Sequence, residues 1–388
     1  MPVKNRFAEL LPEITAWRRD FHEHPELLFD VQRTAGKVAE LLRGFGCDEV
    51  VEGIGRTGVV AVIRGKSDSK GRVIGLRADM DALPIFEATG LDYASKTPGK
   101  MHACGHDGHT AMLLGAAKYL SETRNFDGTA VMIFQPAEEG GGGGREMVDD
   151  GMMDRWGIQE VYGMHNMPGI PVGTFAIRPG AQMAAADQFE VVVTGKGGHA
   201  AKPHECIDTT LVAAQIVVAM QSIASRNVDP LKQVVVSICT FRTESEAFNV
   251  IPQTVLLRGT VRTMDHAVQD FVEARVKAIA EGTAAAFGAV AKVDYQRGYP
   301  VTMNAPENTD YAVKVAQAVS GQVDADTAPL MGAEDFSFML NARPGAYIFL
   351  GNGDTAMVHH PAYNFDDNAI PFGSSWYAGM VEERMPAA

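Results

Sequence analysis

The stretch Met101-His102-Ala103-Cys104-Gly105-His106-Asp107-Gly108-His109-Thr110 decides how the rest of the chain is interpreted. It places three histidines, one cysteine and one aspartate directly before an apolar run, residues 111–120, that is typical of a helix. Packing alone gives no reason for so many side chains that can bind a metal. Because further acids and histidines recur downstream, we interpret the stretch as part of a metal site and not as a histidine-rich surface loop.

Length and composition predict a folded protein of two domains. The chain has 388 residues, whereas single hydrophobic cores stop growing at roughly 250–300 residues. The formal net charge of −14 argues against nucleic acid or an anionic membrane as a partner, since either requires a basic face. No apolar run reaches the roughly 18 residues that span a bilayer, and no signal-peptide pattern is visible, so we expect a cytoplasmic protein.

The four cysteines form no disulfide framework. Cys47, Cys206 and Cys239 lie in or beside apolar runs, and each is predicted to be a small buried hydrophobic residue. Cys104 differs from them because it stands two residues before His106. At this spacing, the side chain is more useful as a thiolate ligand than as core packing.

Strand and helix patterns on both sides of the opening stretch predict an α/β architecture. Apolar spacing predicts helices over 8–29 and 33–45, and β-branched or continuous apolar runs predict buried strands. Open α/β sheets place their sites at the carboxyl ends of strands. Strands at 58–63, 72–76, 130–134 and 161–166 are predicted, and the last three lead into Asp79 and Asp81, into Gln135–Glu139, and into His165.

From about Gln182 the pattern changes to that of a smaller α+β domain. Predicted helices at 209–224 and 267–287 alternate with strands at 189–194, 234–240, 254–263 and 289–295, giving the order βαββαβ of a ferredoxin-like fold. We predict a discontinuous metal-binding catalytic domain over residues 1–181 and 302–388. The smaller domain is predicted to be inserted over residues 182–301.

The candidate ligands are chemically mixed. Thiolate, imidazole and carboxylate together suit Zn²⁺, or else Mn²⁺, Co²⁺ or Ni²⁺. Five donors exceed what one open catalytic site requires, and they fit two divalent ions. The predicted ligands are Cys104, His106, Glu139, His165 and His359.

Glu138, which precedes the predicted ligand Glu139, is predicted to be the general base. Adjacent side chains in an extended turn point in different directions, so one acid can bind metal while the other faces the water. The glycines at 140–144 that follow are interpreted as a mobile loop. They are not interpreted as a phosphate cradle, because no Gly-Lys-Ser/Thr ending follows.

These motifs together resemble the M20 metallopeptidase family, and within it the N-acyl-amino-acid amidohydrolases that include hippurate hydrolases. The resemblance covers nearly the whole chain. It is carried by residues 75–84, 102–109, 135–140, 163–165, 197–200, 249–252, 332–336 and 359–361.

The resemblance implies a zinc-peptidase-like catalytic domain that holds two divalent metal ions, and an inserted lid domain that mediates dimerisation. It implies that His199 stabilises the developing oxyanion and that Asn249 holds the substrate. Asp81 matches an acid that orients a ligand, and Glu334 either contacts substrate or orients a ligand. Of the pair His359-His360, we choose His359 as the ligand because Pro361 fixes the register of the motif.

The expected reaction is hydrolysis of an N-acyl-L-amino acid to a carboxylic acid and a free amino acid. A dipeptidase or an N-acetyl-diaminopimelate deacetylase is the alternative within the family, and a catalytically silent metal-binding protein is the alternative outside it. A thiol nucleophile built on Cys104 is disfavoured, because nearby carboxylates raise a thiol pKa when no metal is bound. Arg258 and Arg262 are open as substrate-carboxylate contacts or as residues of a solvated strand edge.

Overall fold

The structure, a computed structural model, describes residues 4–387, and these fold as two compact units. The first unit comprises the described chain up to Gly180, residues Met303–Ala328, and the described chain from Asp335 onward. The second unit comprises Ala181–Thr302 and Pro329–Glu334. No helix within residues 4–387 is both long enough and apolar enough to cross a membrane.

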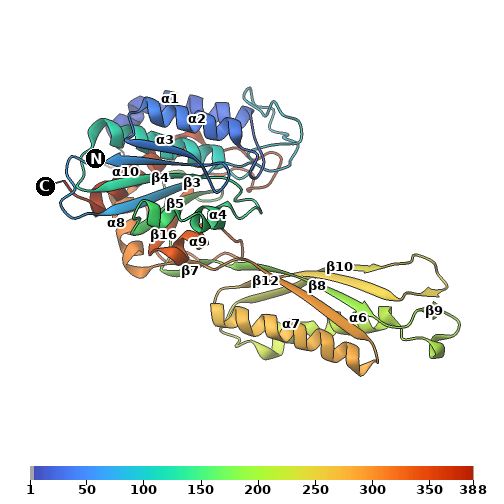
Figure 1. Ribbon diagram of the computed structural model, residues 1–388. Helices are drawn as coiled ribbons and strands as arrows, with labels where there is room; N and C mark the ends of the chain where they lie inside the picture. Colours follow the sequence, from blue (N-terminus) through green and yellow to red (C-terminus); the bar gives the residue numbers. More distant parts are fainter. Residues whose placement is uncertain (1–3, 388) are drawn as a thin grey trace. The chain divides into compact units, whose positions relative to one another are not determined.

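A mixed eight-stranded sheet forms the middle layer of the first unit (Figure 1). Its central strands β3, β4, β5 and β16 pair in parallel and are buried along almost their whole length, as continuous apolar runs predict. The predicted α/β fold is therefore confirmed. In spatial order the strands are β1 (Glu49–Ile54), β2 (Gly58–Arg64), β4 (Thr129–Gln135), β3 (Val73–Asp79), β5 (Glu160–Met167), β16 (Gly345–Gly351), β6 (Phe175–Ala176) and β15 (Val323–Asp324).

Helices cover both faces of this sheet. Helices α1, α2 and α3 lie on one side, and α4 and α9 lie on the other (Figure 1). Apolar side chains of α1, α2, α3, α8 and α10 join one buried core with the strands. The helices are α1 (Asn5–Glu23), α2 (Gln32–Gly44), α3 (His106–Thr123), α4 (Gly143–Asp149), α5 (Met152–Arg155), α8 (Pro306–Ser320), α9 (Ser337–Ala342) and α10 (Ile370–Arg384).

Two predictions about local structure were wrong. The first helix ends at Glu23 and does not continue to residue 29, because His24 precedes a proline, and a residue before proline is disfavoured in helical conformation. The glycine run is not only a loop, since α4 begins at Gly143. A Cβ on Gly143 would lie 1.8 Å from the Pro136 carbonyl oxygen, so glycine is required there by close packing.

The second unit is a four-stranded antiparallel sheet with helices α6 and α7 against one face (Figure 1). Its main elements follow in the order β8, α6, β10, β12, α7, β13. Their bounds, with those of the short strands, are β7 (Gly180–Met183), β8 (Ala185–Thr194), β9 (Gly198–His199), α6 (Thr209–Ser222), β10 (Val234–Thr243), β11 (Val250–Ile251), β12 (Thr254–Thr263), α7 (His266–Ala286), β13 (Val290–Tyr299) and β14 (Thr302–Asn304).

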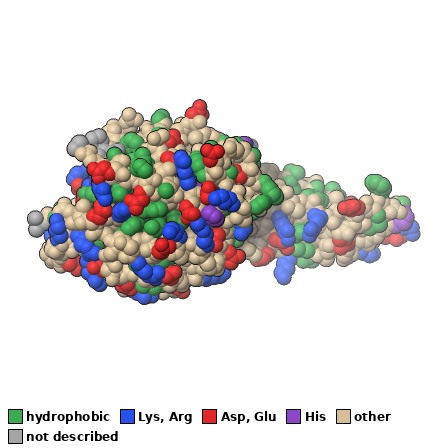
Figure 2. All heavy atoms as spheres, turned by 90° about the horizontal axis from the view of Figure 1, so that it is seen from above, with side chains coloured by type: hydrophobic (Ala, Val, Ile, Leu, Met, Phe, Trp, Pro, Cys, Tyr) green, Lys and Arg blue, Asp and Glu red, His purple; other side chains and the backbone are tan. Residues whose placement is uncertain are grey.

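The surface over the helices of the first unit carries interspersed charges. Figure 2 looks onto this face and shows basic and acidic side chains side by side. Arg6, for example, pairs with Glu9 at 2.9 Å and with Glu122 at 2.9 Å. Exposed pairs of this kind contribute little to stability, about 0–1 kcal/mol each, so the buried core holds the unit together.

Candidate metal centre

The predicted ligands come from separate segments of the first unit that meet at one place. Cys104 and His106 flank the start of α3, Glu139 lies in the turn after β4, His165 lies within β5, and His359 lies in the loop after β16. Within each of three groups, the potential ligand atoms lie within 4.8 Å of one another. The groups are Cys104 with His106 and His165, Cys104 with Glu139 and His359, and His106 with Glu138 and Glu139.

Two buried polar atoms in this cluster fit a bound cation. Among the described residues, His106 Nε2 and Glu139 Oε1 have no hydrogen-bond partner, and they lie 3.9 Å apart. Buried polar atoms are nearly always hydrogen-bonded, and leaving one unsatisfied is costly. A divalent ion bound between these atoms would satisfy both, so the donor set fits a metal site.

The thiol of Cys104 also fits a metal ligand. Its sulfur lies 3.4 Å from His165 Nε2 and is buried. Burial, and after it the carboxylates of Glu139 and Glu138, raise the pKa of this thiol well above its usual value. A thiolate at this position therefore requires a cation, and a thiol nucleophile acting without metal is disfavoured.

The two buried imidazoles differ in charge. Burial, and then neighbouring His109, lower the pKa of His165 to about 3, so this ring is neutral and can donate a lone pair. Burial also opposes charge on His106, but Asp79 and Asp81 outweigh it and raise the pKa of His106 to about 10. His106 Nδ1 lies 2.8 Å from the Asp81 carbonyl oxygen, which leaves Nε2 directed at the cluster.

Asp81 holds the acidic turn in place. Its two carboxylate oxygens accept hydrogen bonds from the backbone amides of Glu138 at 3.0 Å and Glu139 at 3.1 Å. The preceding residue, Ala137, has a φ of +55°, which is uncommon for alanine and reverses the chain at this point. The geometry supports a positioning role for Asp81 with respect to both acids.

A buried network of ion pairs and hydrogen bonds, which the sequence analysis did not predict, lies beside the candidate ligands. Arg77 lies 2.8 Å from Asp79 and 2.9 Å from Asp335, and it donates to Gln135 at 2.8 Å. His109 Nδ1 lies 2.6 Å from Asp79. The one available signal was an arginine in the middle of an apolar strand, because a buried arginine requires carboxylate partners.

The structure distinguishes the two adjacent histidines. His359 Nε2 lies 3.3 Å from Glu139 Oε1, and its backbone amide donates to the Ala103 carbonyl at 2.7 Å. Its φ of +67° turns the side chain into the cluster. Both histidines are exposed, but His360 Nδ1 accepts a hydrogen bond from the Ala362 amide at 3.0 Å. Of the two rings, the one with a nitrogen beside another candidate ligand is that of His359, which remains a predicted ligand.

Two predicted substrate residues are adjacent in the second unit. His199 in β9 pairs with Val250 in β11, and the Ala200 amide donates to the Asn249 carbonyl at 2.9 Å. Both His199 and Asn249 are exposed. Glu334 is buried and ends the short segment that returns to this unit.

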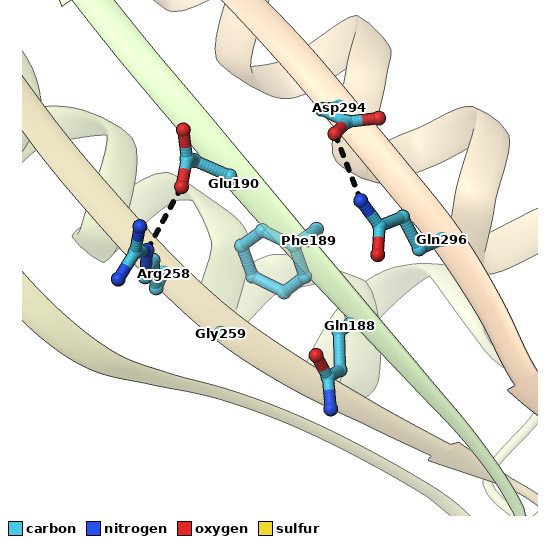
Figure 3. Close-up of a pocket in the computed structure, with 7 residues that line it drawn as sticks. All are labelled: Gln188, Phe189, Glu190, Arg258, Gly259, Asp294 and Gln296. Carbon is cyan, nitrogen blue, oxygen red and sulfur yellow. Dashed lines mark hydrogen bonds and ion pairs between the residues drawn. The ribbon is translucent and has the colours of Figure 1, made fainter. Parts of the chain in front are cut away.

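The sheet of the second unit has a shallow pocket that contains Arg258 (Figure 3). Arg258 Nε donates to Glu190 at 2.8 Å, and Gln296 donates to Asp294 at 3.0 Å (Figure 3). Arg258 lies on an interior strand of the sheet, and its pairing with Glu190 on the neighbouring strand favours an exposed, solvated sheet face over a carboxylate-binding fork.

The prediction for the cysteines was wrong for Cys239, which is exposed, and Cys47 and Cys206 are only partly buried. Cys239 lies where the register of β10 against β12 shifts, between Ile238 and Thr240. An extra residue at such a bulge leaves the regular alternation of buried and exposed positions.

The fold and the donor cluster define an α/β protein whose candidate metal ligands gather where the central strands of its mixed sheet end. The chain belongs to peptidase family M20/M25/M40, whose model matches residues 75–383. It is 43% identical to hippurate hydrolase of Campylobacter jejuni over 96% of this chain and 97% of the relative. It is 40% identical to N-acetylcysteine deacetylase of Bacillus subtilis over 94% of both chains.

Solved structures agree with this membership. A putative aminohydrolase from methicillin-resistant Staphylococcus aureus matches with a TM-score of 0.90 and 34% identity over 97% of both chains. A Bacillus subtilis protein described as a dinuclear metal-binding peptidase of the M20 family matches with a TM-score of 0.86 and 35% identity. The match covers 98% of this chain and 100% of the other.

Proposed function

We propose that this protein is a metal-dependent amidohydrolase that cleaves N-acyl-L-amino acids to a carboxylic acid and a free amino acid. The observation that carries the proposal is the buried carboxylate of Glu138 beside His106 Nε2 and Glu139 Oε1, for which the described residues supply no hydrogen-bond partner. The names of the relatives agree, since hippurate and N-acetylcysteine are both N-acyl amino acids.

Two divalent ions are proposed to bind here, as in the dinuclear relative. Zn²⁺, Mn²⁺, Co²⁺ and Ni²⁺ all suit the mixed donor set. When bound, such ions supply Lewis acidity that makes water a better nucleophile and polarises an amide carbonyl. The proposed ligands are Cys104, His106, Glu139, His165 and His359.

Glu138 is proposed to move the proton. Asp81 fixes the backbone at Glu138, so that its carboxylate faces the ligand atoms of Glu139 and His106. Glu138 accepts a proton from the attacking water and then donates it to the departing amine nitrogen. His199 is proposed to stabilise the oxyanion, a contribution of roughly 3–4 kcal/mol for one donor of this type, and Asn249 is proposed to hold the substrate.

The second unit is proposed to be the inserted lid and dimerisation domain, with the catalytic domain spanning residues 1–181 and 302–388. A homodimer in the cytoplasm is the proposed state. The second candidate function is cleavage of a peptide, because a relative at 39% identity is named thermostable carboxypeptidase 1 of Saccharolobus solfataricus.

The test is amino-acid release from hippurate, N-acetylmethionine, N-acetyl-diaminopimelate and a dipeptide. The protein is first treated with a chelator and then resupplied separately with each of the four metal ions. Cleavage of N-acyl amino acids that is restored by metal supports the proposal, whereas restored cleavage of the dipeptide alone favours the peptidase. No cleavage in a protein that binds two equivalents of metal would indicate a silent binding protein.

A further inference from the structure

Asn166 directly follows the proposed ligand His165 in β5, and it is fully buried. Its side-chain nitrogen Nδ2 donates a hydrogen bond to the Cys104 carbonyl at 2.6 Å, and its Oδ1 accepts one from the Tyr363 hydroxyl at 2.7 Å. Cys104 lies in the loop before α3, and Tyr363 lies in the same loop as His359, after β16. One buried amide therefore connects three segments that carry proposed ligands.

The backbone amide of Asn166 adds a fourth connection, to His109 in the first turn of α3. This amide donates to His109 Nε2 at 2.9 Å, and the side-chain Nδ2 lies 3.0 Å from the same nitrogen. Because a backbone amide can only donate, Nε2 is the acceptor, and Nδ1 carries the proton toward the Asp79 carboxylate at 2.6 Å. Both ring nitrogens are engaged, so His109 connects the ligand segments and does not itself offer a free lone pair to a metal.

The backbone carbonyl of Asn166 orients a ligand ring. His165 Nδ1 lies 2.5 Å from this carbonyl, so Nδ1 carries the proton and the lone pair is on Nε2. This Nε2 lies 3.4 Å from the Cys104 sulfur, on the side of the candidate ligands. Metal-binding histidines commonly donate their second nitrogen to a carbonyl or carboxylate, which fixes both the tautomer and the orientation of the ring.

We propose that Asn166 is a positioning residue of the metal centre, whose side-chain amide fixes Cys104 and His165 relative to each other. This inference rests on the ligand set of the proposed function. The position requires an amide, because the Cys104 carbonyl needs a donor whereas the Tyr363 hydroxyl needs an acceptor. Space is restricted as well, since a Cβ on Gly105 would lie 2.2 Å from Asn166 Nδ2.

The experiment compares Asn166→Ala with the matched control Asn304→Ala. Asn304 is also fully buried in the first unit, and it donates to the Tyr347 carbonyl at 3.0 Å and accepts from the Tyr347 amide at 2.7 Å. Tyr347 lies in β16 and is not a proposed ligand. Both substitutions remove a buried, hydrogen-bonded amide, so both are expected to destabilise the fold.

Metal binding is measured in two ways. Zn²⁺ affinity is determined by competition with a chromogenic chelator, and it is expected to fall about 10–100-fold in Asn166→Ala, the range for residues that orient a metal ligand, and by less than about threefold in Asn304→Ala. Each protein is then loaded with Co²⁺, and its thiolate-to-cobalt absorption is recorded. This absorption is expected to shift or weaken in Asn166→Ala only, because it reports the alignment of Cys104 and not the stability of the fold.

Tyr363→Phe is a milder second variant that removes only the hydroxyl donating to Asn166 Oδ1. Its Zn²⁺ affinity is expected to fall by about two- to tenfold, the equivalent of one hydrogen bond. A Zn²⁺ affinity in Asn166→Ala that matches the unmodified protein or Asn304→Ala would overturn the inference. If Asn166→Ala does not fold, unchanged affinity and cobalt absorption in Tyr363→Phe would overturn it. Failure of the unmodified, metal-loaded protein to hydrolyse N-acyl amino acids would overturn the proposed function alone.

Discussion

Replacing Gly105 with alanine tests whether the metal centre depends on the close packing of its central loop. Gly105 separates Cys104 from His106 and has a φ of +93°. A Cβ there would lie 2.2 Å from Asn166 Nδ2 and 2.5 Å from Tyr363 Oη. These two side chains hydrogen-bond to each other at 2.7 Å, and Asn166 donates to the Cys104 carbonyl at 2.6 Å.

Two costs add in the Gly105→Ala variant. Left-handed backbone costs alanine about 1–2 kcal/mol, and overpacking of a core position costs about 1–3 kcal/mol. We therefore expect the free energy of unfolding to fall by about 2–5 kcal/mol. Metal affinity is expected to fall as well, since both flanking ligands must move. Urea unfolding followed by circular dichroism measures the first quantity, and calorimetric titration with Zn²⁺ measures the second.

Gly46→Ala is the matched control. Gly46 has a similar φ of +78°, but a Cβ there would have no described atom within 4 Å. This variant should lose only the backbone contribution, about 1–2 kcal/mol, and should keep its affinity for metal. Equal losses of stability in the two variants, or unchanged metal affinity in Gly105→Ala, would refute the packing argument.

Three further predictions follow from the same contacts. Glu138→Gln should keep its metal content, measured by atomic emission, while kcat falls by about 10²–10⁴-fold as expected for loss of a general base; a kcat near that of the unmodified protein would remove Glu138 from the mechanism. Arg77→Met should lower the free energy of unfolding by about 3–5 kcal/mol, because two buried carboxylates lose their cation, and a loss below 1 kcal/mol in urea unfolding would contradict this. In metal-free protein at pH 8, Cys104 should react with iodoacetamide far more slowly than the exposed Cys239, because burial and nearby carboxylates raise the pKa of the Cys104 thiol. Peptide mass mapping measures the labelling of each cysteine, and equal labelling of the two would contradict the raised pKa.

The elements of the fold could largely be predicted, because their signals are local. Continuous apolar runs correctly located β3, β4 and β5, and the pattern change near Gln182 located the elements of the second unit. Where prediction failed, a single neighbouring residue or a tertiary contact decided the structure. Pro25 ended α1 early, and the Pro136 carbonyl required a glycine at the start of α4.

The buried polar network around Arg77 could not be predicted, because its members are far apart in the chain. Arg77 meets Gln135 and Asp335, which are 58 and 258 positions away. Each looks unremarkable in its own segment, and only the pairing of β3 with β4 brings Arg77 opposite Ile133 and near Gln135. The ligand candidates were easier to recognise because cysteine and histidine at short spacing carry their chemistry without knowledge of the fold.

Strand β16 lies between β5 and β6 in the sheet, although 177 residues of chain separate it from β5 and 168 separate it from β6. During synthesis, the ribosome therefore releases β5 long before its partner exists, and the edge of β5 stays open until residues 345–351 emerge. The second unit, whose six main elements lie between residues 185 and 299, is complete by then and can fold first. Because His359 follows β16, the five proposed ligands are all present only after residues 345–359 have been synthesised, so binding of metal by the complete set requires this late segment.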